Sequence, residues 1–167
     1  MNETFDPIDL FGAYMKVTGV PSLAWPKAPD PRLQGRSLGL VNGASWISLW
    51  GSYFGGRILP GVKLINVGNE AVQLNFMGAH KRGEPCPPRI NIEKFAQYAD
   101  DLVRLYGVDA IMITCSTMNR AYATVRDAMA RHGVPVIQID EAMMERAVTH
   151  GGRILIDEAD ITAHSID

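Results

Sequence analysis

The stretch Asp109-Ala110-Ile111-Met112-Ile113-Thr114-Cys115-Ser116-Thr117 decides the fold of this chain. Its first six residues form an apolar run with almost no polar alternation, which is typical of a strand covered on both faces of a parallel sheet. Small polar residues follow the run and lead into a helical pattern. We therefore expect a parallel strand at residues 109–114, with Cys115 at the point where a helix follows.

Strand and helix patterns alternate on both sides of this stretch. The other predicted strands are residues 37–41, 62–67, 134–139 and 153–156. The predicted helices are residues 46–58; 91–106, with Asn91 as N-cap and Gly107 at its end; 119–132, ended by Gly133; and 140–150, with Asp140 as N-cap. In the last helix we expect Met143, Met144, Ala147 and Val148 to face inward. Residues 68–90 contain many breakers and are expected to form a long connection.

This alternation predicts an α/β fold. We expect a parallel sheet of four or five strands flanked by helices, in the flavodoxin-like order 2-1-3-4-5. A chain of 167 residues is long enough for one such lobe, which we assign to residues 36–167. Residues 1–35 are punctuated by prolines and are predicted to form an irregular N-terminal arm, with a short helical pattern at 8–15.

Composition argues against several classes of protein. A net charge of −2 gives no electrostatic reason to expect nucleic acid or an anionic membrane as a partner. There is no apolar run of about 18 residues that could span a membrane, and the acidic first residues do not resemble a secretory signal. Cys86 and Cys115 do not suggest a disulfide framework, so the cytoplasm is the expected compartment. We expect no metal and no cofactor, because the sequence has neither metal-ligand spacing nor a glycine-rich phosphate motif.

The strand order predicts where a ligand site lies. In open α/β sheets, ligands bind beyond the carboxyl ends of the strands at a switch point, here between the first and third strands. The loops at that point lead into helix N-termini, which favour a carboxylate or a phosphate. The candidate ligand-binding residues are Asn42, Gly43, Ser45, Ser116, Thr117 and Asn119, with Asn69 after the second strand.

Cys115 is the candidate catalytic residue. A thiol near a helix N-terminus has a lowered pKa, and its thiolate can act as a base or as a nucleophile. An alternative fits the pattern equally well: a small buried cysteine that ends a strand, because free cysteines are often packing residues. For Asn69 and Glu70, solvated loop positions are the alternative, since polar side chains are mostly exposed.

The same segments resemble a known family. Residues 107–117 are similar to the ADAI-x-x-ACNT strand and loop of the aspartate/glutamate/hydantoin racemase superfamily, and residues 134–143 resemble the strand and helix that follow it. Residues 37–45 resemble its first strand and substrate loop, so that the likeness covers about residues 36–156. The resemblance implies cofactor-independent chemistry beside a carboxylate, between two similar lobes that each supply a cysteine. Cys115 matches the first-lobe cysteine, Ser116 and Thr117 match the carboxylate-binding pair, and residues 42–45 match the substrate loop.

The chain also departs from the family pattern. The second catalytic cysteine and its Gly-Cys-Thr-His-type motif are absent, and Asp157-Glu158-Ala159-Asp160 stands where a Thr-rich loop is usual. The resemblance therefore implies the first lobe only. A homodimer would bring two Cys115 residues together, with Trp46, Trp50, Tyr53 and Phe54 at the interface; a buried helix explains these aromatic residues equally well.

Two main hypotheses follow from these observations. The first is a cofactor-independent amino-acid racemase- or isomerase-like protein that binds a small carboxylate and uses Cys115 as the α-proton base. With a single cysteine, one-base chemistry such as decarboxylation also fits. The second is a catalytically incomplete, dimeric ligand-binding or structural module that lacks the second lobe. A cysteine hydrolase is a third reading, which requires a histidine near Cys115.

Overall fold

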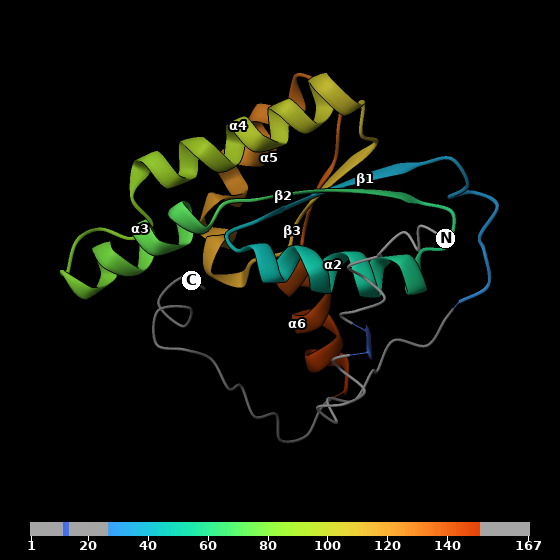
Figure 1. Cartoon of the computed structure of the whole chain (residues 1–167), viewed down its shortest axis with the longest axis horizontal. Helices are drawn as coiled ribbons and strands as arrows, with labels where there is room; N and C mark the ends of the chain where they lie inside the picture. The colour runs from blue at the N-terminus through green and yellow to red at the C-terminus, as the bar shows by residue number, and fades with distance from the viewer. Residues whose placement is uncertain (1–11, 14–26, 151–167) are drawn as a thin grey trace, which may run out of the picture.

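The computed structural model describes residues 12–13 and 27–150, which contain a parallel sheet with helices on both faces (Figure 1). The strands are β1 (Ser37–Asn42), β2 (Lys63–Gly68), β3 (Ala110–Ile113) and β4 (Val136–Gln138). All three strand pairings are parallel, and the order is β2-β1-β3-β4. The predicted α/β class and the order of these four strands are therefore confirmed. The predicted fifth strand and most of the N-terminal arm lie outside the described residues.

The helices form two layers around this sheet. They are α2 (Ser45–Ile58), α3 (Glu70–Lys81), α4 (Arg89–Tyr106), α5 (Tyr122–Ala130) and α6 (Ile139–His150), with a 3₁₀-helix, η1 (Ser116–Ala121), between β3 and α5. Figure 1 shows α4 and α5 over one face of the sheet and α2 and α6 over the other. Gly107 ends α4 in the left-handed conformation, with φ of 63°, as predicted.

The main core lies between the sheet and the layer formed by α4 and α5. Val41, Ile111 and Ile113 point toward this layer and are completely buried. The helices contribute large apolar side chains to the same cluster, among them Phe76, Phe95, Leu102, Val125 and Met129. This close packing fixes β1 and β3 side by side, and with them the loops at their carboxyl ends.

The opposite layer is packed much more loosely. No residue of α2 is buried, and in α6 only Asp140 is. The prediction that Met143, Met144 and Val148 face inward is wrong, because they are 54%, 39% and 78% exposed. The physical reason is that α6 packs against β4, a strand of three residues at the edge of the described sheet, which is too short to cover an apolar helix face.

The prediction of a long connection at residues 68–90 is also wrong, because α3 occupies most of it. Val72, Phe76 and Ala79 recur at helical spacing and are buried against the core. The Asn69 side chain caps this helix by accepting a hydrogen bond from the Ala71 backbone N–H at 2.9 Å. Polar residues between the apolar positions, and the glycine and prolines after them, obscured the pattern.

Two further helix starts differ from the prediction. Asn91 is not the N-cap of α4, which begins at Arg89; its buried amide instead donates to the Val72 carbonyl at 3.0 Å and accepts from Asn75 at 2.9 Å. The helix predicted at residues 119–132 is divided into η1 and α5. The chain turns into a 3₁₀ conformation directly after Cys115, three residues earlier than predicted.

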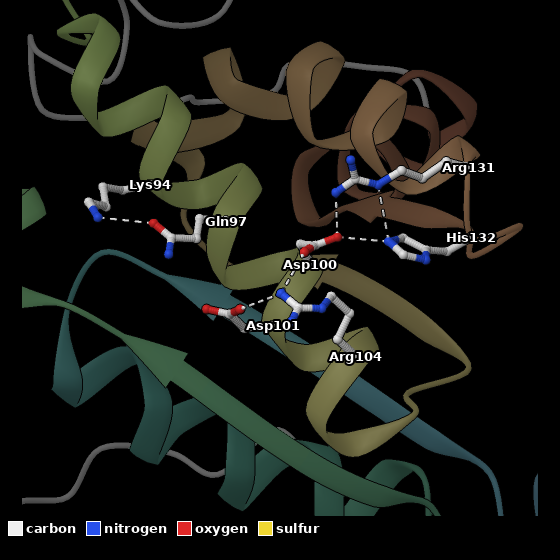
Figure 2. A network of polar contacts seen from close by, with 7 residues as sticks. All are labelled: Lys94, Gln97, Asp100, Asp101, Arg104, Arg131 and His132. Carbon is white, nitrogen blue, oxygen red and sulfur yellow. Dashed lines mark hydrogen bonds and ion pairs between the residues drawn. The ribbon is translucent and has the colours of Figure 1, made fainter.

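A charged cluster joins α4 to the end of α5 (Figure 2). Asp100 of α4 accepts a hydrogen bond from Arg131 Nη2 at 2.5 Å and contacts the His132 ring nitrogen at 2.7 Å. Arg104 lies 3.5 Å from the other oxygen of Asp100. These groups hold the pKa of Asp100 down at about 2, with the His132 contact as the largest cause.

Candidate functional site

The predicted site lies at the carboxyl edge of the sheet, where β1 and β3 are neighbours. The register pairs Val41 with Ile113, and the Thr114 backbone N–H donates to the Val41 carbonyl at 3.0 Å. The loops that follow the two strands, residues 42–45 and 115–119, therefore begin side by side. This arrangement agrees with the switch point expected from the sequence.

Cys115 is buried at this edge, with 4% of its surface exposed. Burial raises the pKa of its thiol above the usual value, against the prediction of a lowered pKa. Hydrogen bonds to the sulfur from the backbone N–H groups of Met118, Gly43 and Thr117, and from the Thr117 hydroxyl, oppose this effect. The lowering expected at a helix N-terminus is outweighed because the thiol packs into the core instead of facing solvent.

Gly43 lies between the thiol and α3. A Cβ atom added at Gly43 would lie 3.6 Å from Cys115 Sγ and 2.7 Å from Gln73 Oε1. A side chain at this position would be in ordinary contact with the thiol but would displace the end of the Gln73 side chain. Gln73 Oε1 is buried and has no hydrogen-bond partner, which makes it an unused acceptor beside the thiol. Sequence reasoning missed Gln73 because α3 was not predicted; its position one turn after the Asn69 cap is the signal that would have found it.

Asn42 is completely buried at the end of β1 and faces α2. Its amide and the Ser48 hydroxyl are mutual partners, at 3.1 Å and 3.3 Å. A Cβ atom added at Gly68, which pairs with Asn42 across the sheet, would collide with the Asn42 Oδ1 atom. In this conformation the Asn42 side chain is committed to the packing of α2 against β1 and β2.

Ser45, at the first turn of α2, already has an anionic partner. Oε1 of Glu70 accepts hydrogen bonds from the Ser45 backbone N–H at 3.1 Å and from its hydroxyl at 2.7 Å. The carboxylate that the sequence predicts at this helix N-terminus is thus supplied by α3 of the same chain. Glu70 is exposed, as the solvated alternative expected, but it belongs to the site through this contact.

Asn69 acts as a structural residue in this conformation. Its carbonyl oxygen caps α3, and its amide nitrogen donates to the Tyr98 hydroxyl at 2.5 Å. Both polar ends of the side chain are used, so that Asn69 joins α3 to α4. Its location after β2 was predicted, whereas this pairing was not.

Asn119 and Asp140 form a buried pair between η1 and the start of α6. The Asn119 amide donates to Asp140 Oδ2, and the two residues are 8% and 9% exposed. Burial raises the pKa of Asp140, and the hydrogen bond from Asn119 partly offsets this. Asn119 Oδ1 is buried and has no partner. Asp140 lies within the first turn of α6 and does not precede it, so the prediction of an N-cap is wrong.

The predicted residues are thus brought to one edge of the sheet, but most are paired within the fold. Gly43 and Thr117 contact Cys115 through hydrogen bonds, whereas Asn42, Ser45, Asn69 and Asn119 have other partners. Ser116 is half-buried. Two buried acceptors without partners, Gln73 Oε1 and Asn119 Oδ1, belong to the elements around the thiol. A ligand that offers hydrogen-bond donors would satisfy them.

Within residues 12–13 and 27–150, no three His, Cys, Asp or Glu side chains are grouped so that they could hold a metal ion. Over the same residues, no helix has the length and apolar character needed to cross a membrane. Comparison of the chain with family models, with curated proteins and with solved structures found no match.

Proposed function

We propose that this chain is a cofactor-independent racemase- or isomerase-like protein that binds a small carboxylate and uses Cys115 as the base for the α-proton. The observation that carries the proposal is the place of Cys115 at the carboxyl edge of the sheet, where the loops after β1 and β3 begin side by side. Backbone N–H groups of both loops and the Thr117 hydroxyl act as donors that favour the charged form of the sulfur. Such donors stabilise a thiolate more than a thiol. The resemblance of residues 107–117 to the racemase strand and loop supports the same role.

The proposed step is a proton transfer that needs no further reagent. The Cys115 thiolate takes the α-proton and becomes a thiol, while the electron pair stays on the carbon and is delocalised into the neighbouring carboxylate. Return of a proton to that carbon completes the cycle. In a homodimer, a thiol from the second copy would return the proton on the opposite face. Both cysteines of this chain are free thiols, which fits a reducing compartment such as the cytoplasm.

The burial of Cys115 favours a second candidate, a dimeric ligand-binding or structural module without catalysis. At 4% exposure the sulfur cannot meet a substrate in this conformation, and its raised pKa lowers the thiolate population at neutral pH. In this second candidate, the hydrogen bonds to the sulfur are part of the packing between β3, η1 and the Gly43 loop.

Deuterium incorporation separates the two candidates. We expect the full-length protein in D₂O to exchange the α-proton of a small amino acid such as aspartate or glutamate, as followed by proton NMR. Cys115→Ser should abolish the exchange, and Cys86→Ser is the matched control that should retain it. Absence of exchange in all three proteins would reject proton transfer for these acids, and the ligand-binding or structural module would be the remaining candidate.

A further inference from the structure

A cavity of about 360 Å³ lies between α2 and the sheet, on the face opposite the main core. Its sheet wall is formed by Leu38 and Leu40 of β1, Leu64 of β2 and Met112 of β3. Its helix wall contains the rings of Trp50 and Phe54, which stack with centroids 5.1 Å apart and planes at 12°. The cavity explains why a helix as apolar as α2 has no buried residue.

This cavity is separate from the Cys115 site. Side chains alternate along β3, so that Ile113 belongs to the core under α4 and α5 while Met112 and Thr114 line the cavity. Cys115 continues the alternation on the core side, and its sulfur contacts the Gly43 loop and η1. A molecule in the cavity would therefore lie on the other face of the sheet from the thiol.

Two glycines set the distance between α2 and the sheet. A Cβ atom added at Gly55 would lie 2.6 Å from Leu64 Cδ1, and one at Gly51 would lie 3.0 Å from Leu40 Cδ1. The helix backbone is thus in close contact with β1 and β2 at these positions. The bulky neighbours Trp50 and Phe54 stand beside the contact and enclose the space that remains. The cavity therefore lies beside a close contact between α2 and the sheet, and it does not result from a separation of the helix from the sheet.

We propose that this cavity binds one neutral, apolar molecule with an aromatic ring system. Its volume of about 360 Å³ falls in the range of small-molecule sites, which are about 300–1,000 Å³ and mostly apolar. None of the described residues that line it is ionisable, so a charged ligand would lose its hydration without gaining a partner. The rings of Trp50 and Phe54 stand in its helix wall, and aromatic rings pack favourably with one another in offset or edge-to-face arrangements. The site lies between two layers of the fold and suits a small molecule better than a polypeptide.

The proposal does not depend on proton transfer at Cys115, and a fluorescent probe tests it directly. We expect 1-N-phenylnaphthylamine, which is neutral, to bind the full-length protein saturably at one site per chain with increased emission. Naphthalene should displace it, and naphthalene-1-sulfonate should be at least about tenfold weaker as a competitor, which corresponds to about 1.4 kcal/mol. Emission that rises without saturation, or equal competition by the sulfonate, would overturn the proposal.

Variants that fill the cavity from two different walls locate the site. We expect Leu38→Trp in β1 and Ile139→Trp in α6 each to weaken probe binding by about tenfold or more, because both parent residues line the cavity. Leu105→Trp is the matched control, since Leu105 is 68% exposed on α4, and it should bind like the wild type. Circular dichroism identifies any variant that fails to fold. The probe affinity of the other filling variant then decides whether the probe binds in the cavity.

Two other results would overturn the proposal. If sedimentation shows a dimer that excludes the probe and dissociates in both filling variants, a second copy of the chain covers this face. If neither filling variant changes probe affinity, the probe binds elsewhere on the protein.

Discussion

The Glu70 carboxylate lies over the first turn of α2, where it accepts hydrogen bonds from both the backbone N–H and the hydroxyl of Ser45. The contact joins the start of α3 to the start of α2, next to the ends of β1 and β2. It also places a negative charge where a helix N-terminus favours one. A ligand carboxylate at this turn must therefore share the donors of Ser45 with Glu70 or displace it.

Removal of this internal cap should weaken α2. We expect Glu70→Ala to lower the free energy of unfolding by about 1 kcal/mol, the usual cost of a lost N-terminal cap, and Glu70→Gln to cost less because an acceptor remains. Urea unfolding followed by circular dichroism measures both changes. Glu145→Ala is the control on α6. In the Ser45→Ala background, Glu70→Ala should cost less than in the wild type, and equal costs would contradict a direct contact.

The strands were predictable because their pattern allows few alternatives. Apolar runs at residues 37–41 and 109–114, separated by helical periodicity, fit a parallel sheet and little else. The usual strand order then places the loop that follows Asn42 beside the loop that begins at Cys115. The site could be found to this extent from sequence alone, because the carboxyl ends of parallel strands lie at one edge.

The partners of the site residues could not be predicted in this way. Ser48, Glu70 and Gln73 lie on helices, and their contacts depend on how α2 and α3 are rotated and seated against the sheet. The burial that raises the pKa of Cys115 is likewise a property of this packing. Periodicity gives the apolar face of a helix, but it does not give the neighbour that each polar side chain meets.

Cys115 should make stability depend on pH in the alkaline range. Because burial raises the pKa of the thiol in the folded state above its usual value of 9.0, the unfolded chain loses this proton first as the pH rises. Stability from the neutral buried thiol is thus complete below about pH 9 and is lost as the pH approaches the folded pKa. In a Cys86→Ser background, the unfolding free energy relative to Cys115→Ser should therefore decrease between pH 8 and 10.5.

A difference that increases over this range would show that the four donors outweigh burial, and a constant difference would show that the two effects balance. An increase would mean that the pKa of Cys115 in the folded state lies below its usual value, and it would strengthen the assignment of Cys115 as a base.

The charged cluster around Asp100 predicts the opposite dependence at acid pH (Figure 2). The pKa of Asp100 is about 2, below its usual 3.8, so its stabilisation is present above pH 4 and is lost as the pH falls toward 2. We expect Asp100→Asn to cost about 1 kcal/mol at pH 7, a value that allows for solvent screening. The cost should vanish near pH 2. Asp101→Asn, which removes only a 3.8 Å contact with Arg104, should cost less at every pH.

The Asn119–Asp140 pair predicts a third pH dependence, again with the opposite sign to Asp100. Because burial raises the pKa of Asp140, the folded state binds its proton more tightly than the unfolded state. Its contribution to stability is therefore complete below pH 3.8 and is lost as the pH rises through the folded pKa. Asp140→Asn, which stays neutral, should gain stability relative to the wild type between pH 3.5 and 7 in thermal unfolding.

Asn119→Ala should lose stability over the same range, because it removes the hydrogen bond that holds the buried carboxylate. If both differences are independent of pH, Asp140 is solvated and the pair does not join η1 to α6.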